Sequence, residues 1–572
     1  MLLLSLLGAL AAVIPRVDGF PASQYTVVHS LEGAVPEGWT LKVGDEVDKT
    51  SARMKLRIYL SQPRISEFHE LATKIATPGH ALYGQHLSKE DADAFLAPDA
   101  HSLELVQDWL ASENLGDRAE FDSAADCVVV VASVEEAERL LKTEYSSFVD
   151  KQSGRAVLRT LQYSVPDILA SHIDVIEPTT FFGMKRRGLT ENLWNLSPAD
   201  IEAAKRNCSY ITPACLSKLY NYGRAETYSN GLMGIAGFIN ESASPSDLSV
   251  FMKRASTQHN ADQSFTCVSV NGGRCTPDVG TVEANLDVQY ARAITRNIPN
   301  VFYSTGGAPP VIGNVTDNEP YLEFLHYFLA LRNEDLPNTL SISYGDVESS
   351  VPRRYAAKCC DLFAKLGARG VSVLVASGDS GAAEGDCPNG RFEAGFPASC
   401  PWVTAVGGTV GVDAEKAWVG SGGGFSALFP RPGYQSGAVN TWLKHDKTHA
   451  GQTPYFNASG RAYPDVSALA STHLVIFKNK TLGVYGTSAS TPVVAALVQL
   501  LNSDRMLRKK KPLGFLNPWI YYHAASAMKD ISNGAIQGCN NGTGFRAVPG
   551  WDPTTGFGTP DFEKLLSISR AT

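Results

Sequence analysis

Residues 486–492 read Gly486-Thr487-Ser488-Ala489-Ser490-Thr491-Pro492 and lead into the almost wholly apolar run 493–501. Small residues come first, and the proline sits where the first turn of a helix tolerates it. We therefore expect a buried helix that starts near this proline, with Ser488 at its mouth. Unpaired N–H groups and the helix dipole favour negative charge there. Ser488 is then either an ordinary helix cap or a nucleophile beside an oxyanion site.

The composition is that of a folded globular protein. Of 572 residues, 44% are hydrophobic and 19% are charged, and the net charge is −8. A chain of this length exceeds one hydrophobic core, so we expect two or three domains. The longest basic run, 508–511, reads as a solvated helix end, so we expect no binding of nucleic acid.

Several features point to the secretory pathway. Residues 1–14 are short and apolar, typical of a signal peptide spanning 1–19, although a buried N-terminal helix is the alternative. No later run reaches the roughly 20 apolar residues of a membrane span. Ten cysteines without a Cys-x-x-Cys metal pattern suit an oxidising compartment. We expect a secreted glycoprotein, or alternatively a vacuolar or lysosomal one, with acceptor asparagines at Asn195, Asn207, Asn240, Asn314, Asn457, Asn479 and Asn541.

Residues 20–183 are expected to form a separate first domain. Strand patterns occur at 54–60, 127–132 and 157–163. Helical patterns occur at 65–75, 89–96, 103–113 and 134–142. Strands and helices mix without repeated βαβ units, which predicts an α+β sandwich. His80 and His86 lie in a turn-rich link and are expected to be structural rather than ligands.

Residues 184–207 lose periodicity and are expected to be a linker. The basic sequence Lys185-Arg186-Arg187-Gly188 suits proteolytic processing. A self-contained domain, a cleavable linker and a larger second domain make the layout of a zymogen.

Residues 208–572 change to an α/β pattern. Buried strands are expected at 231–238, 339–344 and 371–376. Helices are expected at 245–254, 282–296 and 321–332. This alternation predicts a parallel sheet covered by helices on both faces, with an active site beyond the carboxyl ends of its strands. Asp379 follows the strand at 371–376 and so lies at such an end.

A serine nucleophile needs a base, which is usually histidine. The histidines after Cys208 stand in no obvious strand-end or helix-start motif, so carboxylates are the candidates. Glu283 and Asp287 are four residues apart and share one face of the expected helix. On a buried face they would share a proton, which would raise a pKa, whereas a solvated acidic face is the alternative.

Taken together, these motifs resemble the sedolisin (serine-carboxyl peptidase) family. They are Ser488 after Gly-Thr, Glu283 and Asp287 in Glu-x-x-x-Asp, and Asp379 in Ser-Gly-Asp-Ser-Gly. The similarity continues through 395–401, 406–409, 421–426 and 463–468. The first domain resembles the activation prodomain of that family, including 83–88 and 172–174. The resemblance covers nearly the whole chain and is nearest to fungal secreted tripeptidyl-peptidases and their lysosomal relatives.

The resemblance implies a role for each residue. Ser488 attacks the peptide carbonyl, Glu283 takes its proton and Asp287 orients Glu283. A neutral Asp379 donates a hydrogen bond to the oxyanion, which requires a raised pKa. We expect activity in acid that is lost near neutral pH. Asp465 has no role that we can assign and is expected to act in capping or core hydrogen bonding.

The resemblance also implies further sites. Residues 341–345 and 421–426 would form the two walls that pair with substrate backbone. One structural calcium ion would be held by two carboxylates and three carbonyls, from Asp530, Ile531, Val548, Gly550 and Asp552. Val548 stands where relatives often have glycine, and a plain Asx-turn is the alternative.

Cys208/Cys215 and Cys267/Cys275 are close enough to close small loops. Cys359 and Cys360 cannot readily pair with each other, which requires a longer link or a free thiol.

The expected function is that of an acid peptidase made as a zymogen, which removes tripeptides from free N-termini. Its partners would be peptide or unfolded protein substrates and its own prodomain, as intramolecular inhibitor and chaperone. We expect a monomer. The same motifs serve endopeptidases, which is one alternative, and a secreted peptidase-like binding protein is the non-enzymatic one.

Overall fold

The computed structural model describes residues 24–572 apart from short gaps. The gaps are 37, 44–46, 123–125, 152–153, 155, 184–189, 195, 224–228, 257–263, 278–279, 308–319, 384–386, 388–389 and 447–452. The expected signal peptide and the Lys185–Gly188 sequence therefore lie outside the described residues. Within the described residues, no helix is both long and apolar enough to cross a membrane.

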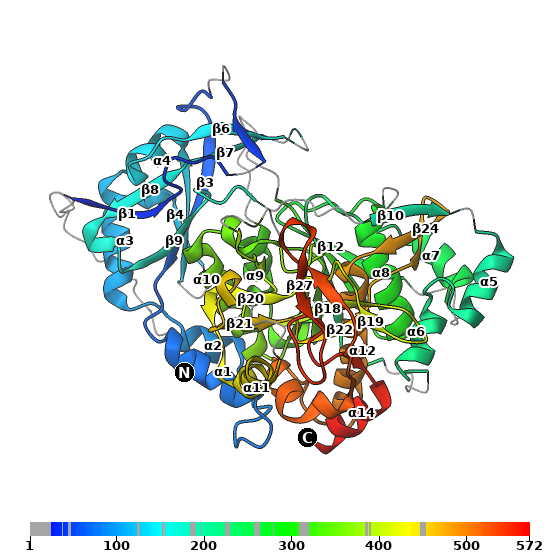
Figure 1. Cartoon of the computed structure of the whole chain (residues 1–572). Coiled ribbons are helices and arrows are strands. Elements are labelled where there is room, and N and C mark those ends of the chain that lie inside the picture. The colour runs from blue at the N-terminus through cyan, green and yellow to red at the C-terminus, as the bar shows by residue number, and fades with distance from the viewer. Residues whose placement is uncertain are drawn as a thin grey trace, which may run out of the picture.

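The second domain is built on a parallel sheet of seven strands (Figure 1). Their spatial order is β12 (Thr266–Val270), β13 (Asn300–Thr305), β11 (Met233–Gly237), β14 (Thr339–Ile342), β16 (Ser372–Ala376), β18 (Thr404–Val410) and β22 (Val466–Leu469). A short strand, β19 (Lys416–Ala417), pairs antiparallel with β18. The three strands expected from the sequence are all present in this sheet.

Helices cover both faces of this sheet, as expected. In β16, Leu374 points into the core that contains α8 (Val282–Thr295) and α12 (Thr487–Leu507). Its neighbours Val373 and Val375 point into the opposite core, with α9 (Pro320–Ala330) and α10 (Arg353–Ala368). Because side chains alternate along a strand, this division assigns the two helix pairs to opposite faces. The helix expected at 245–254 is α7 (Pro245–Arg254), capped by Ser244 as the sequence indicates.

The first domain is an α+β unit, as expected. Its antiparallel sheet has the order β4 (Ala119–Phe121), β5 (Cys127–Ser133), β3 (Arg53–Leu60) and β9 (Ile173–Glu177). Its helices are α1 (Ile65–Ala76), α2 (Lys89–Phe95), α3 (Ala100–Ser112) and α4 (Val134–Leu141). The single strand expected at 157–163 is wrong: two strands, β7 (Ala156–Arg159) and β8 (Gln162–Pro166), belong to different small sheets.

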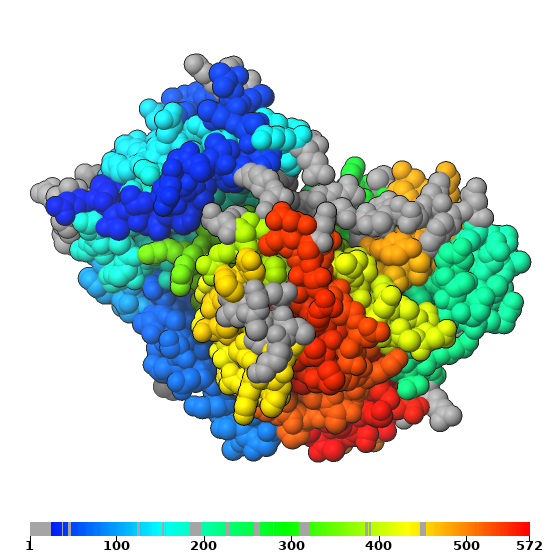
Figure 2. Space-filling view, viewed as in Figure 1, coloured from blue at the N-terminus to red at the C-terminus, as the bar shows by residue number. Residues whose placement is uncertain are grey.

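The first domain packs against α9 and α10 of the second (Figures 1 and 2). Phe181 stacks on Tyr355 with ring centroids 4.6 Å apart. Ion pairs also cross the contact, among them Lys358–Asp174 at 3.2 Å and Lys365–Asp93 at 2.7 Å. His86 was expected to be structural. Its Nε2 lies 2.8 Å from the Pro512 carbonyl oxygen, a contact that links the two domains.

The linker expected at 184–207 is ordered where it is described. Residues Thr190–Trp194 form β10, which pairs antiparallel with β24 (Lys480–Tyr485), and Pro198–Asn207 form α5. The strand was missed because its pairing depends on a partner almost 300 residues away. Since β24 leads directly to Gly486, this segment is anchored to the strand that precedes Ser488.

Four disulfides link the second domain: Cys208–Cys215, Cys267–Cys275, Cys360–Cys400 and Cys387–Cys539. The two short loops are those that the spacing favours. Cys359 and the first-domain Cys127 are buried free thiols, so both a longer link and free thiols occur.

Asp465 has the core hydrogen-bonding role expected of it. It is fully buried and accepts hydrogen bonds from Arg461 at 2.6 Å, the Ala405 amide at 2.8 Å and the Tyr521 hydroxyl at 2.8 Å. Arg461 is equally buried, and the neighbouring Asp465 carboxylate raises its pKa, opposing the effect of burial. The pair therefore holds β18, the segment before β22, and the helix near Tyr521 together.

Asp465→Ala should destabilise the domain by about 3–5 kcal/mol, because it leaves the Arg461 charge buried without its carboxylate. The loss is measured as the difference in the free energy of unfolding, by denaturant, between the Ser488→Ala chain and the same chain carrying this change. Glu67→Ala removes a solvent-exposed partner of Arg64 and serves as the control, with little expected change. Equal effects of the two substitutions would contradict the prediction.

Candidate active site

Ser488 lies in the first turn of α12 and is 6% exposed. Gly486 follows β24 with φ +147°, a conformation that favours glycine, and its amide donates to the Ala470 carbonyl at 2.8 Å. The helix begins at Thr487, five residues before Pro492, so the expected start at the proline is wrong. Proline has no N–H, so residue 492 cannot donate to the Ser488 carbonyl in the usual helical bond.

Glu283 and Asp287 occupy α8, in which every residue is buried. The solvated-face alternative is therefore wrong. Burial raises the pKa of both carboxyls well above the usual values, and the charge of Asp287 adds to the shift at Glu283. Hydrogen bonds act in the other direction: one with the Ser488 side chain lowers the pKa of Glu283, and one from Ser343 lowers that of Asp287. The Ser343 hydroxyl donates to Asp287 Oδ1 at 2.8 Å.

A third buried carboxyl belongs to the same cluster and was missed in the sequence. Glu241 is 4% exposed, and its charge contributes to raising the pKa of both Glu283 and Asp287. It follows the carboxyl end of β11, which is the edge where an active site is expected in a parallel sheet. An acidic residue four positions after a buried strand was the available signal.

Asp379 lies just after the carboxyl end of β16, as expected. Gly378 before it has φ +118°, which turns the chain towards the start of α12. Asp379 Oδ1 accepts a hydrogen bond from the Thr487 amide at 2.7 Å and lies 2.9 Å from the Thr487 hydroxyl. Its charge also raises the pKa of Glu283, although less than burial does. Asp379 thus sits at the N-terminus of the helix that carries Ser488.

The four candidate residues come together at one edge of the sheet. The Ser488 hydroxyl donates to the Ser343 carbonyl at 3.3 Å, and Ser343 follows the carboxyl end of β14. Two buried histidines of the second domain lie elsewhere: His326 belongs to α9 on the opposite face, and the ring of His473 packs on Tyr290 with centroids 4.8 Å apart. Acidic side chains therefore surround the serine in the part of the chain that the structure describes.

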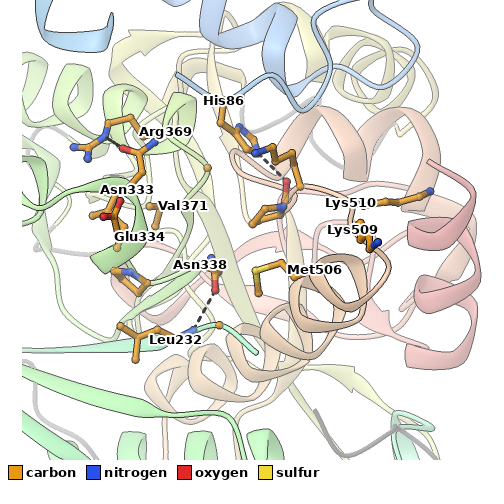
Figure 3. Close-up of a pocket in the computed structure, with 16 residues that line it drawn as sticks. His86, Leu232, Asn333, Glu334, Asn338, Arg369, Val371, Met506, Lys509 and Lys510 are labelled. Carbon is orange, nitrogen blue, oxygen red and sulfur yellow. Dashed lines mark hydrogen bonds between the residues drawn. The ribbon is translucent and has the colours of Figure 1, made fainter. Parts of the chain in front are cut away.

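A cavity of about 670 Å³ opens at the opposite edge of the sheet (Figure 3). Leu232, Asn338 and Val371 line it, and they precede β11, β14 and β16. Figure 3 also shows His86 of the first domain, together with Lys509 and Lys510, among the residues that line this cavity. Because none of the four candidate residues lines this cavity, it is separate from the serine site.

The expected calcium ligands form one hydrogen-bonded network. Asp552 is fully buried and accepts from the Val548, Thr554 and Thr555 amides at 2.8–3.0 Å. Asp530 accepts from the Gly550 amide at 2.8 Å, and the Ile531 carbonyl accepts from the Thr555 hydroxyl at 3.4 Å. Burial raises the pKa of Asp552 to about 8. Two carboxyls and backbone carbonyls are the oxygen donors that a hard cation prefers, so these residue types fit calcium.

The raised pKa values give a pH-dependent prediction for stability. A carboxyl whose pKa is raised in the folded state binds more protons when folded, so its contribution is fully present below the unfolded pKa and is lost as pH rises towards the folded value. Glu283→Gln or Asp287→Asn, in a Ser488→Ala background, should therefore raise the thermal midpoint more at pH 7 than at pH 4. Each kcal/mol corresponds to roughly 2–4 °C.

The exposed Glu563 supplies a matched control, since Glu563→Gln should shift the midpoint equally at the two pH values. A larger gain at pH 4 than at pH 7 for the α8 variants would count against buried, proton-binding carboxyls.

Comparison with known proteins agrees with this architecture. A model described as Pro-kumamolisin, activation domain, matches residues 41–182, and one described as Subtilase family matches 328–510. Tripeptidyl-peptidase SED4 of Arthroderma otae is 38% identical, covering 93% of both chains, and Tripeptidyl-peptidase SED2 of the same organism is 38% identical, covering 96% of both. A solved Pseudomonas sedolisin is 22% identical, covers 63% of this chain and 98% of its own, and has a TM-score of 0.49. The chain belongs to the sedolisin (serine-carboxyl peptidase) family of serine-type peptidases.

Proposed function

We propose that this peptidase releases tripeptides from the free N-termini of peptides and unfolded proteins in acid. The observation that carries the proposal is the convergence of a helix-tip serine with buried carboxyls at the carboxyl edge of the sheet. The tripeptide specificity rests on the relatives, both named tripeptidyl-peptidases and similar over almost their whole length. A sedolisin-type endopeptidase is the second candidate, because the same catalytic groups would serve internal cleavage.

Each candidate residue has a defined task in the proposal. Ser488 Oγ attacks the scissile carbonyl carbon while its proton passes to the Glu283 carboxylate. Asp287 holds Glu283 in place, and the Ser343 hydroxyl in turn fixes Asp287. When the tetrahedral intermediate collapses, Glu283 returns the proton to the leaving amine. Water then repeats the sequence on the acyl-enzyme.

Asp379 is assigned to the oxyanion. Its Oδ1 is occupied by hydrogen bonds at Thr487, which orients the carboxyl at the N-terminus of α12. A protonated carboxyl in this position donates a hydrogen bond to the developing negative charge, and the helix dipole adds to the effect. The reaction needs a negative charge at Glu283 and a proton on Asp379 together. That combination becomes rare as pH rises, which accounts for activity in acid.

The substrate would bind between two backbone segments. The Ser343 carbonyl lies beside Ser488, which supports 341–345 as one wall of the binding groove. The Gly422 amide donates to the Gly378 carbonyl at 2.7 Å, which brings 421–426 next to the Asp379 turn and supports it as the other wall. An extended substrate would pair with both by β-augmentation.

The proposal also covers the secretion and maturation of the chain. A signal peptide at 1–19 directs secretion, a prodomain at 20–183 inhibits and assists folding, and a linker at 184–207 is cut to give an active domain at 208–572. The activation-domain match at 41–182 supports the second of these parts. Vacuolar or lysosomal delivery is the alternative destination. Glycans at exposed Asn207, Asn240 and Asn479, and a monomeric state, complete the proposal.

Products formed from a defined peptide test the function most sharply. Incubation in mildly acidic buffer should release the N-terminal tripeptide first, as read by mass spectrometry. Ser488→Ala should abolish both this release and self-processing, while Ser490→Ala, on the same helix, should keep activity within a few-fold. Internal fragments from an N-terminally blocked peptide would favour the endopeptidase. No turnover by the folded, processed chain would favour a binding protein.

We also propose one structural Ca²⁺, held by carboxylates of Asp530 and Asp552 and carbonyls of Ile531, Val548 and Gly550. Chelation should lower both the thermal midpoint and activity, because it leaves the buried Asp552 carboxyl without a cation. Asp552→Asn should reproduce the loss and be insensitive to chelator, whereas Asp561→Asn, nearby at a helix cap, should respond like the parent chain. Unchanged midpoint and activity after chelation would remove the calcium claim.

A further inference from the structure

A second group of possible metal ligands lies far from the serine, where the two domains meet. In the first domain, Asp122 directly follows β4 and Asp126 directly precedes β5, and His326 belongs to α9 of the second domain. One ligand atom from each residue lies within 4.8 Å of the other two. The group therefore exists only while the prodomain is docked on the catalytic domain.

Two of these side chains have polar atoms without a hydrogen-bond partner in the described structure. Asp126 is 2% exposed: its Oδ2 accepts from Gln62 Nε2 at 2.8 Å, no partner is found for Oδ1, and the neighbouring Asp122 carboxyl also acts on this side chain. His326 Nε2 is also buried without a partner. Leaving such atoms unpaired in a folded interface costs free energy. A bound cation would offset that cost.

The surroundings leave room for an ion. Asp122, Asp126 and His326 line a cavity of about 210 Å³ together with Lys89, Asp93 and Lys365. Both lysines pair with Asp93, at 2.5 and 2.7 Å, and the charge of Lys365 also acts on Asp126. Lys358, the next nearby cation, pairs with Asp174 at 3.2 Å. Asp122 and Asp126 are two adjacent carboxyls that face the His326 imidazole.

The imidazole is suited to metal binding. Its buried Nε2 has no hydrogen-bond partner among the described residues, so it can offer a lone pair to a metal ion. The ring also packs against Tyr59 of the prodomain, with centroids 5.1 Å apart, which limits its rotation. A neutral imidazole with two carboxylates is a donor set that borderline cations such as Zn²⁺ accept.

We propose that the unprocessed chain binds one divalent cation of the zinc type through Asp122, Asp126 and His326, and that this ion clamps the prodomain onto the catalytic domain. Water would complete the coordination. Because the mature enzyme lacks the two prodomain ligands, processing destroys the site and releases the ion. A ligand that binds only the docked form shifts the equilibrium towards docking, so the ion should slow prodomain release.

Isothermal titration calorimetry tests the site. ZnCl₂ is titrated into the full-length Ser488→Ala chain in the presence of saturating calcium. We expect one equivalent to bind, and Asp126→Asn or His326→Gln to weaken binding at least tenfold. Asp122→Asn, at a less buried position, serves if either variant fails to fold by circular dichroism. His69→Gln is the matched control, since His69 lies at the same interface but pairs with Asp361 at 2.9 Å. It should bind zinc like the parent.

A kinetic arm separates this site from the proposed peptidase activity. Zinc should slow dissociation of the prodomain from the catalytic domain, measured on a chain nicked in the linker and carrying Ser488→Ala, and His326→Gln should remove that effect. This readout needs no catalysis, so it stands even if the proposed specificity fails. The proposal would be overturned if the chain bound no zinc, or if zinc binding were unchanged in all three ligand variants. The chain would bind no zinc if Asp122 and Asp126 instead shared a proton.

Discussion

The burial of carboxyl groups around Ser488 is the constraint on which the catalytic domain depends. Glu241, Glu283 and Asp287 are withdrawn from water at one place, and each charge opposes the others. Burying an uncompensated carboxylate is costly, so burial raises the pKa of Glu283 and of Asp287 well above its usual value. The parallel sheet supplies the rigid frame, because α8 and the ends of β11 and β14 hold these side chains together despite their repulsion.

The contact between the domains uses buried charges in the opposite way. Arg57 pairs with Glu323, Lys358 with Asp174 and Lys365 with Asp93, so opposite charges meet across the interface. Removing one partner of a buried pair is strongly destabilising, which makes these contacts specific for the docked arrangement. The serine site gathers like charges and favours protons, whereas the interface gathers opposite charges and favours docking. A zymogen needs both properties in one chain.

Local patterns in the sequence predicted much of this structure. The spacing of Glu283 and Asp287 placed them on one helical face, and the strand before Asp379 placed it at the edge of the sheet. The position of Glu241 after a buried strand was a similar signal that was missed. The contacts of Glu241 and of the Ser343 hydroxyl with α8 were not predictable from local patterns, because each is brought there by a strand about 40–60 residues away in the chain. The β10–β24 pairing and the Cys360–Cys400 link depend likewise on tertiary contacts. The start of α12 was predicted too late in the chain because Pro492 was taken to mark the first turn. Proline also occurs inside buried helices when packing offsets the lost hydrogen bond.

Whether carboxyl groups, and not an imidazole, activate Ser488 is tested most directly by the pH dependence of kcat/KM for the mature enzyme. This quantity reports the pKa values of the acid and base in the free enzyme. The arrangement of Glu283, Asp287 and Asp379 predicts a maximum in acid and a fall towards neutrality. A maximum at neutral pH or above, as a histidine base would give, would contradict the account.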